Sequence, residues 1–309
     1  MFIDIFNEIP WQSFQQLEAI KNLPLNEQKE KYEYYLSEIE LARDYYYQYQ
    51  VKGAPNGNTS TGDYASCSSG MDVVFIIDYT GSMRTAIDNI KNQVLSIVQT
   101  IIDESGGDYR LGLVLFDEYG GTYTAPSQIR YGESSAYTSL PASQKIINQG
   151  TGHFQVLTTM EVMSSQNQSS FETQLAYLNT TGLIPASANF PIGNGDGTDE
   201  PGDMASEEIV DNGFAGSFRN NVAKLCIIIT DAPPGGDNDN YDQDTIDRLT
   251  QTAANAVNNS IQFLVMSHIA ILPNTGYRIL SDNTNGIYTN GFNPDDIIEA
   301  IEDLCTDNA

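Results

Sequence analysis

The arrangement of apolar and polar residues predicts alternating strands and helices over most of the chain. Val73–Ile77 is an unbroken apolar run, mostly of β-branched residues, which is typical of a strand buried on both faces in a parallel sheet. Ala223–Thr230 is a second run of this kind. Shorter apolar or alternating runs predict four further strands, at 109–116, 154–160, 261–267 and 286–288.

Helical spacing of apolar residues predicts the segments between these strands. The clearest amphipathic helix covers 87–101 and ends at Gly106–Gly107. The last helix is marked by Asn293 as N-cap and Pro294 at the first helical position. Further helices are predicted at 168–178, 204–211 and 243–257. Buried strands that alternate with amphipathic helices predict an α/β fold with a doubly wound, mainly parallel sheet.

The N-terminal residues follow a different pattern and predict a helical arm over 1–51. Residues 26–50 contain no Gly or Pro, and a tyrosine-rich apolar stripe recurs there at helical spacing: Tyr32, Tyr35, Leu36, Ile39, Ala42 and Tyr46. The stripe is consistent with packing on the main domain, with self-association as a coiled coil, or with docking on another subunit. Residues 52–70 have the composition of a flexible linker, which leaves 71–309 as the main domain.

The charge balance argues against several classes of function. The chain carries 14 basic and 41 acidic residues, a net charge of −27. Nucleic acids and anionic membrane surfaces would be repelled, whereas divalent cations and basic protein surfaces are favoured. No segment approaches the ~18–20 apolar residues of a membrane-spanning helix.

The first eight residues contain two acids and no base, unlike a secretory signal peptide. We therefore expect either that the chain is not secreted by the classical route or that the sequence lacks its leader. The location remains unknown at this stage, with a virion and the extracellular space as candidates.

Oxygen-bearing side chains follow both central apolar runs. Asp78, Thr80 and Ser82 alternate directly after the first run, and Asp231 follows the second. The carboxyl ends of parallel strands lie at one rim of a sheet, where ligands bind in doubly wound folds. Because hard cations prefer oxygen ligands, these residues are candidate ligands of a divalent ion.

The segment Asp78–Met83 closely resembles the metal-ion-dependent adhesion site (MIDAS) loop of von Willebrand factor A (VWA) domains. The resemblance covers about 70–305 and includes two later elements in the family's order, the loop 197–203 and the segment Thr230–Pro234. It implies the Rossmann-like VWA fold. It also implies an ion, Mg²⁺ or else Mn²⁺ or Ca²⁺, held by Asp78, Thr80, Ser82 and Asp231.

The second-loop ligand that the resemblance implies has more than one candidate. Thr198 fits the threonine that many VWA domains use, and Asp203 fits the acid of the integrin-β-like branch, with Glu200 ranked behind these two. The additional metal site of integrin β domains needs acids where this chain has Thr85 and Ala86. The resemblance therefore implies that this additional site is absent.

The resemblance also bears on the cysteines. The two ends of a VWA domain emerge close together on the rim away from the metal, and several members carry a disulfide there, which implies a bond between Cys67 and Cys305. The missing secretion signal argues against such a bond, because a reducing cytosol keeps thiols free. Cys226 lies inside an apolar run and is expected to pack there as a free thiol.

The long Gly- and Tyr-rich segment 117–152 is expected to border the metal rim and to influence partner choice. In the family's topology, the strands before and after it form an antiparallel hairpin at one edge of the sheet.

These features favour a metal-dependent protein-binding domain on a helical attachment arm, whose partner offers an acidic side chain to the ion. The alternative is a structural component of a larger assembly, such as a virus particle, in which the arm docks on another subunit. An enzyme is not expected, since Ser82 lacks the Gly-x-Ser-x-Gly context and no phosphate-binding Gly-x-x-x-x-Gly-Lys loop occurs.

Overall fold

The structure, a computed structural model, divides into two compact units. One comprises Met1–Ser60 with Ile269–Thr275, and the other comprises Thr61–His268 with Gly276–Ala309. The residues that it describes are 10–17, 20–45, 64–120, 139–150, 152–180, 190–193, 195, 199–235, 238–267 and 276–307.

The N-terminal unit has a small aromatic core of its own. It contains α1 (Trp11–Phe14) and α2 (Leu25–Tyr45). Phe14 and Tyr35 are buried, and their ring centroids lie 5.4 Å apart. Tyr32 also packs on Phe14, at 5.0 Å. The N-terminal part of the predicted stripe therefore packs within the arm itself, while Tyr46 and the side chains of Ile39 and Ala42 lie outside the described residues.

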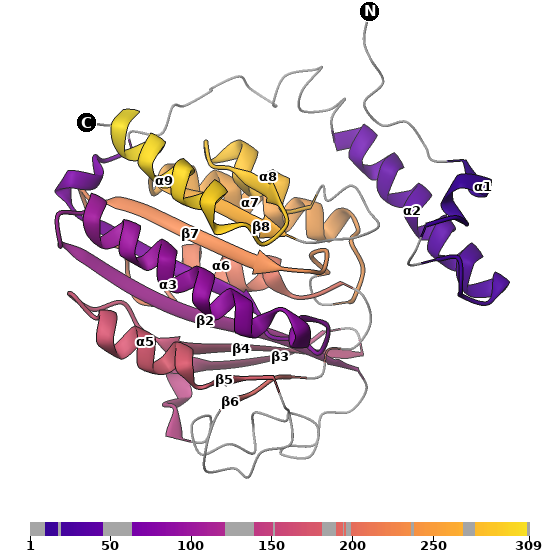
Figure 1. The fold of residues 1–309 in the computed structure, drawn as a ribbon, viewed down its shortest axis with the longest axis horizontal. Helices are drawn as coiled ribbons and strands as arrows, with labels where there is room; N and C mark the ends of the chain where they lie inside the picture. The colour runs from indigo at the N-terminus through magenta and orange to yellow at the C-terminus, as the bar shows by residue number, and fades with distance from the viewer. Residues whose placement is uncertain are drawn as a thin grey trace, which may run out of the picture. The chain divides into compact units, whose positions relative to one another are not determined.

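The larger unit is built on a seven-stranded mixed sheet, drawn in Figure 1 with its helices. The strand order is β3-β4-β2-β1-β7-β8-β9. Strand β4 is antiparallel to both of its neighbours, β2 and β3, and all other neighbouring strands are parallel. The strands are β1 (Met71–Asp78), β2 (Tyr109–Gly120), β3 (Lys145–Gln149), β4 (His153–Glu161), β7 (Ala223–Thr230), β8 (Ile261–Ser267) and β9 (Tyr288–Asn290). The predicted α/β class with a doubly wound, mainly parallel sheet is confirmed.

Helices cover both faces of this sheet. On one face α3 (Ile87–Glu104) packs between α5 (Gln168–Ala176) and α9 (Pro294–Asp307), over the side chains of Val73, Phe75 and Ile77. On the other face α6 (Gly202–Asn212) packs against α7 (Gln243–Asn258), which in turn contacts α8 (Arg278–Asn283). A separate two-stranded pairing joins β5 (Leu178–Asn179) to β6 (Phe190–Pro191).

The central strand β1 is buried along its whole length. Its last residue, Asp78, pairs in register with Phe116 of β2, and Ile77 pairs with Ile229 of β7. Because all three strands run parallel, their carboxyl ends reach the same rim of the sheet. The loops that begin at Asp78 and Asp231 are therefore neighbours.

The segment predicted as a loop at 117–152 contains regular structure. Strand β2 continues to Gly120, and β3 forms an antiparallel pair with β4. The expected hairpin of β2 and β4 is antiparallel, but β3 covers its outer side, so β4 is not the edge of the sheet. Residues 145–149 contain only two apolar residues and are not buried, so their sequence pattern does not predict a strand. Residues 121–138 lie outside the described part of the chain.

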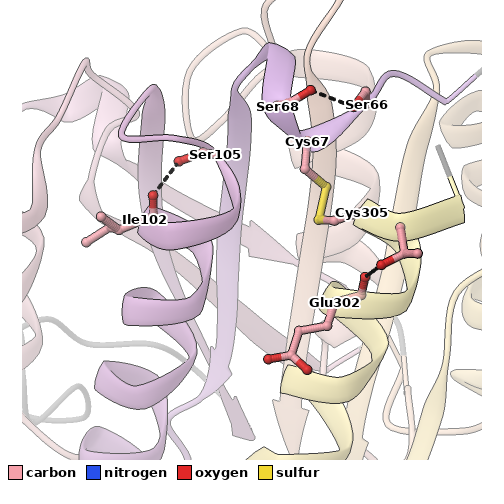
Figure 2. Close-up of a disulfide and its surroundings, with 8 residues drawn as sticks. Ser66, Cys67, Ser68, Ile102, Ser105, Glu302 and Cys305 are labelled. Carbon is pink, nitrogen blue, oxygen red and sulfur yellow. Dashed lines mark hydrogen bonds between the residues drawn. A yellow bond between two sulfur atoms is a disulfide. The ribbon is translucent and has the colours of Figure 1, made fainter. Parts of the chain in front are cut away.

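A disulfide joins Cys67 to Cys305, as the resemblance implied. Figure 2 shows the short helix Cys67–Ser69 directly beside the C-terminal end of α9. Residues 64–70, assigned to the linker by composition, thus belong to the folded domain, which begins earlier than predicted. The two cysteines are 238 residues apart in sequence, and the loop-closure entropy model gives a bond of this span about 5.5 kcal/mol as an upper value. Cys226 is fully buried, and burial raises the pKa of its thiol.

A buried carboxylate fixes the opposite end of β1. The Asp72 side chain has no solvent exposure and accepts hydrogen bonds from Arg110 Nε and Arg219 Nε, each at 2.9 Å. The Arg219 backbone N–H also donates to it, at 2.7 Å. Burial opposes ionisation, but these donors and the positive charges lower the pKa of Asp72 below its usual value. The carboxylate therefore connects β1, β2 and the segment before β7.

We predict that Asp72→Asn destabilises the domain by about 2–3 kcal/mol at pH 7, because two arginines lose their shared anion. A carboxyl whose pKa is lower in the folded state than in the unfolded state stabilises the fold. This contribution is fully present at pH values above the unfolded-state pKa of about 3.9, and it is lost as the pH falls through the folded-state pKa. Urea unfolding at pH 7 and at pH 3 should therefore show a larger difference between wild type and variant at pH 7. The exposed Asp88→Asn is the control. A constant difference at both pH values would contradict this account.

Candidate metal site at the carboxyl ends of the central strands

Asp78 is the innermost residue of the candidate site. Its carboxylate is fully buried at the end of β1. Oδ1 accepts from the Thr80 backbone N–H at 3.0 Å and from Thr80 Oγ1 at 2.7 Å, and Oδ2 accepts from Thr230 Oγ1 at 2.7 Å. All three donors are neutral. Burial, followed by the nearby charge of Asp231, raises the pKa of Asp78.

A row of closely spaced oxygens continues from Asp78 to the Asp231 loop. Thr80 Oγ1 lies 3.0 Å from Ser82 Oγ, which donates to Asp231 Oδ1 at 2.8 Å. Thr80 is buried, whereas Ser82 is exposed and Asp231 is partly exposed. The structure therefore brings together four predicted ligands, Asp78, Thr80, Ser82 and Asp231, in a cluster that opens to solvent at Ser82.

Tyr79 anchors the first loop from behind. Its side chain points into the core, where its hydroxyl donates to Phe190 O at 2.5 Å and accepts from the Asn179 backbone N–H at 2.6 Å. Its own backbone N–H donates to Phe116 O at 2.9 Å. Successive side chains in an extended segment point to opposite sides. Because Tyr79 points into the core, Asp78 and Thr80 on either side of it face the rim.

The second loop places Glu200 against the cluster. Its backbone N–H donates to Pro233 O at 2.8 Å, and its carbonyl accepts from Gly235 N at 2.9 Å, so this loop lies beside the Asp231 loop. A Cβ on Gly195 would lie 2.9 Å from Glu200 Oε1 and 3.2 Å from Thr80 Cβ. The Glu200 carboxyl and Thr80 therefore border the same small space.

One oxygen of the Glu200 carboxyl lacks a hydrogen bond in the described part of the chain. Glu200 is 4% exposed, and its Oε2 is the buried oxygen without a hydrogen-bond partner among the described residues. Burial, and then the neighbouring carboxylates of which Asp78 is the strongest, raise the pKa of Glu200 well above its usual value. A nearby cation would relieve both the missing contact and the repulsion.

Asp203, one of the two favoured second-loop candidates, is paired with an arginine of another helix. It lies in the first turn of α6, fully buried, and Oδ2 accepts from Arg248 Nη1 of α7 at 2.7 Å. The geometry thus favours Glu200, ranked third from the sequence, over Asp203. The sequence could not decide this, because Arg248 is 45 residues away from its partner. Thr198, the other favoured candidate, lies outside the described residues.

Two acidic residues at this rim were missed by the sequence analysis. Asp117 Oδ1 accepts from Gly195 N at 2.9 Å and so holds the second loop. Glu118, also fully buried, lies 2.9 Å from His153 Nδ1 of β4. Asp117 and Glu118 directly follow the apolar run of β2, just as Asp78 follows the apolar run of β1. This position in the sequence could have identified them as candidates.

The donor set fits a small divalent ion. Successive oxygens of Asp78, Thr80, Ser82 and Asp231 lie 2.7, 3.0 and 2.8 Å apart. Neighbouring ligands of octahedral Mg²⁺, each 2.0–2.1 Å from the metal, are separated by about 3.0 Å. Among the described residues, no group of three or more His, Cys, Asp or Glu side chains forms a metal cluster. The hydroxyls of Thr80 and Ser82 would therefore be indispensable donors.

Comparison with known proteins gives similarity in three-dimensional structure alone. No protein-family model and no curated protein matches the chain. Proximal thread matrix protein 1 from the mussel byssus, in two crystal forms, matches 76% of this chain at 12% and 13% identity, with a TM-score of 0.44. A von Willebrand factor type A structure from Catenulispora acidiphila matches 77% of it at 12% identity, with a TM-score of 0.43.

The chain spans less than half the length of these solved structures: 47% and 48% of the two byssus structures and 42% of the bacterial one. Similarities at these TM-scores assign neither a function nor a partner to it.

Two buried tyrosines beside the site provide a matched test of these contacts. The Tyr277 hydroxyl is fully buried without a hydrogen-bond partner in the part of the chain that the structure describes, and a Cβ on Gly202 would lie 2.1 Å from it. We predict that Tyr79→Phe, which loses two hydrogen bonds, costs about 1–3 kcal/mol, whereas Tyr277→Phe is neutral or stabilising. Urea unfolding of both variants measures this. Equal destabilisation by the two substitutions would show that Tyr277 has a polar partner.

Proposed function

We propose that the main domain is a VWA-type binding module that captures a protein partner through a divalent ion at Asp78, Thr80, Ser82 and Asp231. The observation that carries this proposal is the row of closely spaced oxygens from Thr230 through Asp78, Thr80 and Ser82 to Asp231. It joins the carboxyl ends of two adjacent central strands with oxygen donors alone. The preferred ion is Mg²⁺, with Mn²⁺ or Ca²⁺ as substitutes.

Each residue has a distinct part in this proposal. Asp78 supplies a carboxylate held in one orientation by three neutral donors, and Thr80 and Ser82 supply hydroxyls. Asp231 contributes its carboxylate directly or through water, and Glu200 supports the second-loop side. When bound, the ion offers an open coordination position to a carboxylate of the partner. Ser82 and Asp231, the solvent-accessible members, border the route by which the partner approaches.

We further propose that the site binds without catalysing a reaction. The Thr80 and Ser82 hydroxyls are hydrogen-bonded to carboxylates or to each other, with no histidine among their partners in the described part of the chain. His153, which that part includes, lies against Glu118 instead. Histidine is the most frequent general base for a nucleophilic hydroxyl.

The disulfide supports an oxidising location for the domain, outside the cell or at the surface of a particle. None of the helices in the described residues is both long and apolar enough to cross a membrane.

A second candidate function rests on the N-terminal unit. Its helices have an aromatic core of their own, separate from that of the main domain. This favours an attachment module that docks on another subunit of a larger assembly, such as a virus particle, while the main domain serves as scaffold or surface decoration.

We predict that the protein binds one Mn²⁺ or Mg²⁺ ion with an affinity that Asp78→Ala abolishes, because the innermost anionic donor is lost. Isothermal titration measures this, with Asp88→Ala on the exposed face of α3 as the matched control. Undiminished binding by Asp78→Ala would contradict the proposed site.

The second-loop donor can be identified in the same titration. Glu200→Gln should weaken binding about tenfold or more, since a carboxyl that can ionise beside the bound ion is replaced by an amide that cannot. Asp203→Asn should destabilise the fold by breaking its ion pair with Arg248, and change ion affinity less than about threefold. The reverse order of effects would assign the second-loop role to Asp203.

We predict that residues 61–309 fold without the N-terminal unit, with an unfolding midpoint close to that of the full chain, because the two cores are separate. Urea unfolding of the shortened and full chains tests this, and size-exclusion chromatography reports whether the unit drives self-association. An insoluble or unfolded 61–309 chain would show that the arm is part of the core.

A further inference from the structure

A polar hollow of about 680 Å³ lies at the rim opposite Asp78. It is bordered by the segment before β1, by the start of β7 and by the turn that joins α7 to β8. All of these elements belong to the main domain. The disulfide holds the first of them in place, because Tyr64–Ser66 directly precede Cys67 (Figure 2).

The lining of this hollow differs in charge from the rest of the molecule. Its eleven residues include no Asp or Glu, although the chain has 41 of them. The lining comprises serines, two small apolar residues, Lys224, Tyr64 and four asparagines: Asn220, Asn221, Asn258 and Asn259. Sites for drug-like ligands are mostly apolar, so this composition indicates a hydrophilic ligand.

Much of the hydrogen-bonding capacity here is not used within the protein. The side chains of Asn220, Asn221 and Asn258 make no hydrogen bond in the described structure and are exposed. Each amide offers two donors and an acceptor oxygen. Lys224 Nζ donates to Asn259 O at 2.7 Å, which fixes its direction and leaves two of its three donors.

Two further features give the hollow a fixed form. The Tyr64 hydroxyl donates to Thr284 O at 2.8 Å, so the ring forms a defined part of the wall. Asn221 and Ser260 have left-handed backbone conformations, with φ of 60° and 56°. Asparagine adopts this conformation readily in turns, whereas for serine it is uncommon.

We propose that this hollow binds a neutral saccharide. Sugar hydroxyls are both donors and acceptors, which matches amide side chains, and the C–H face of a pyranose packs on an aromatic ring such as that of Tyr64. The chain's net charge of −27 disfavours polyanionic glycans even though Lys224 is present. The proposal is independent of the metal site at the other rim.

The test is an NMR titration of the full chain with maltotriose, cellotriose and chitotriose, which follows the side-chain amide signals of Asn220, Asn221 and Asn258. We expect at least one of these probes to shift the three signals saturably at millimolar concentration, with the same affinity in the presence of EDTA. Asn220→Ala/Asn258→Ala should weaken binding about tenfold or more through loss of two amides. Asn89→Ala/Asn92→Ala, at exposed positions of α3 away from the hollow, is the matched control.

Three results would overturn the proposal. The first is that none of the probes shifts the asparagine signals, and the second is that the double variant binds as tightly as wild type. The third is tighter binding of a sulfated oligosaccharide than of its neutral parent, which would assign the hollow to anionic glycans. Loss of binding in EDTA would place the saccharide at the metal rim and equally contradict this site.

Discussion

Strand β1 has a parallel neighbour on each side and helices over both faces, and every one of its residues is buried. A strand in this position cannot slip by one residue without exchanging its two buried faces. Its register therefore determines that Asp78 ends level with Phe116 of β2 and beside the end of β7. The position of Asp231 near Ser82 is a consequence of the same register.

The two ends of β1 use buried carboxylates in opposite ways. Asp72 receives hydrogen bonds from two arginines, and its pKa is lowered despite its burial. Burial, followed by the nearby charge of Asp231, raises the pKa of Asp78, although its hydrogen bonds from neutral groups act in the opposite direction. The first carboxylate has its counter-charge within the protein and stabilises the fold. The second leaves a counter-charge to be supplied from outside, which is what a site for a divalent ion requires.

Most of the fold and the inner part of the site could be predicted from the sequence, because both depend on local signals. Continuous apolar runs identified β1 and β7, and the residues directly after them include Asp78 and Asp231. The remainder depends on contacts between distant segments. Strand β3 is short and exposed, so it forms a strand because it pairs with β4 and not because of its own sequence pattern. Likewise, the orientation of Glu200 toward Thr80, and of Asp203 toward Arg248, is set by how loops and helices pack.

The central claim is that the oxygens of Asp78, Thr80, Ser82 and Asp231 surround a divalent ion. Anomalous X-ray diffraction from crystals grown with Mn²⁺ tests it most directly, because the signal locates the ion without assumptions about its ligands. We expect an anomalous peak within coordination distance of Asp78 and Ser82, with the Glu200 carboxyl facing it and Asp203 still paired with Arg248. A fully occupied peak elsewhere, or no peak at this rim with the cluster still internally hydrogen-bonded, would contradict it.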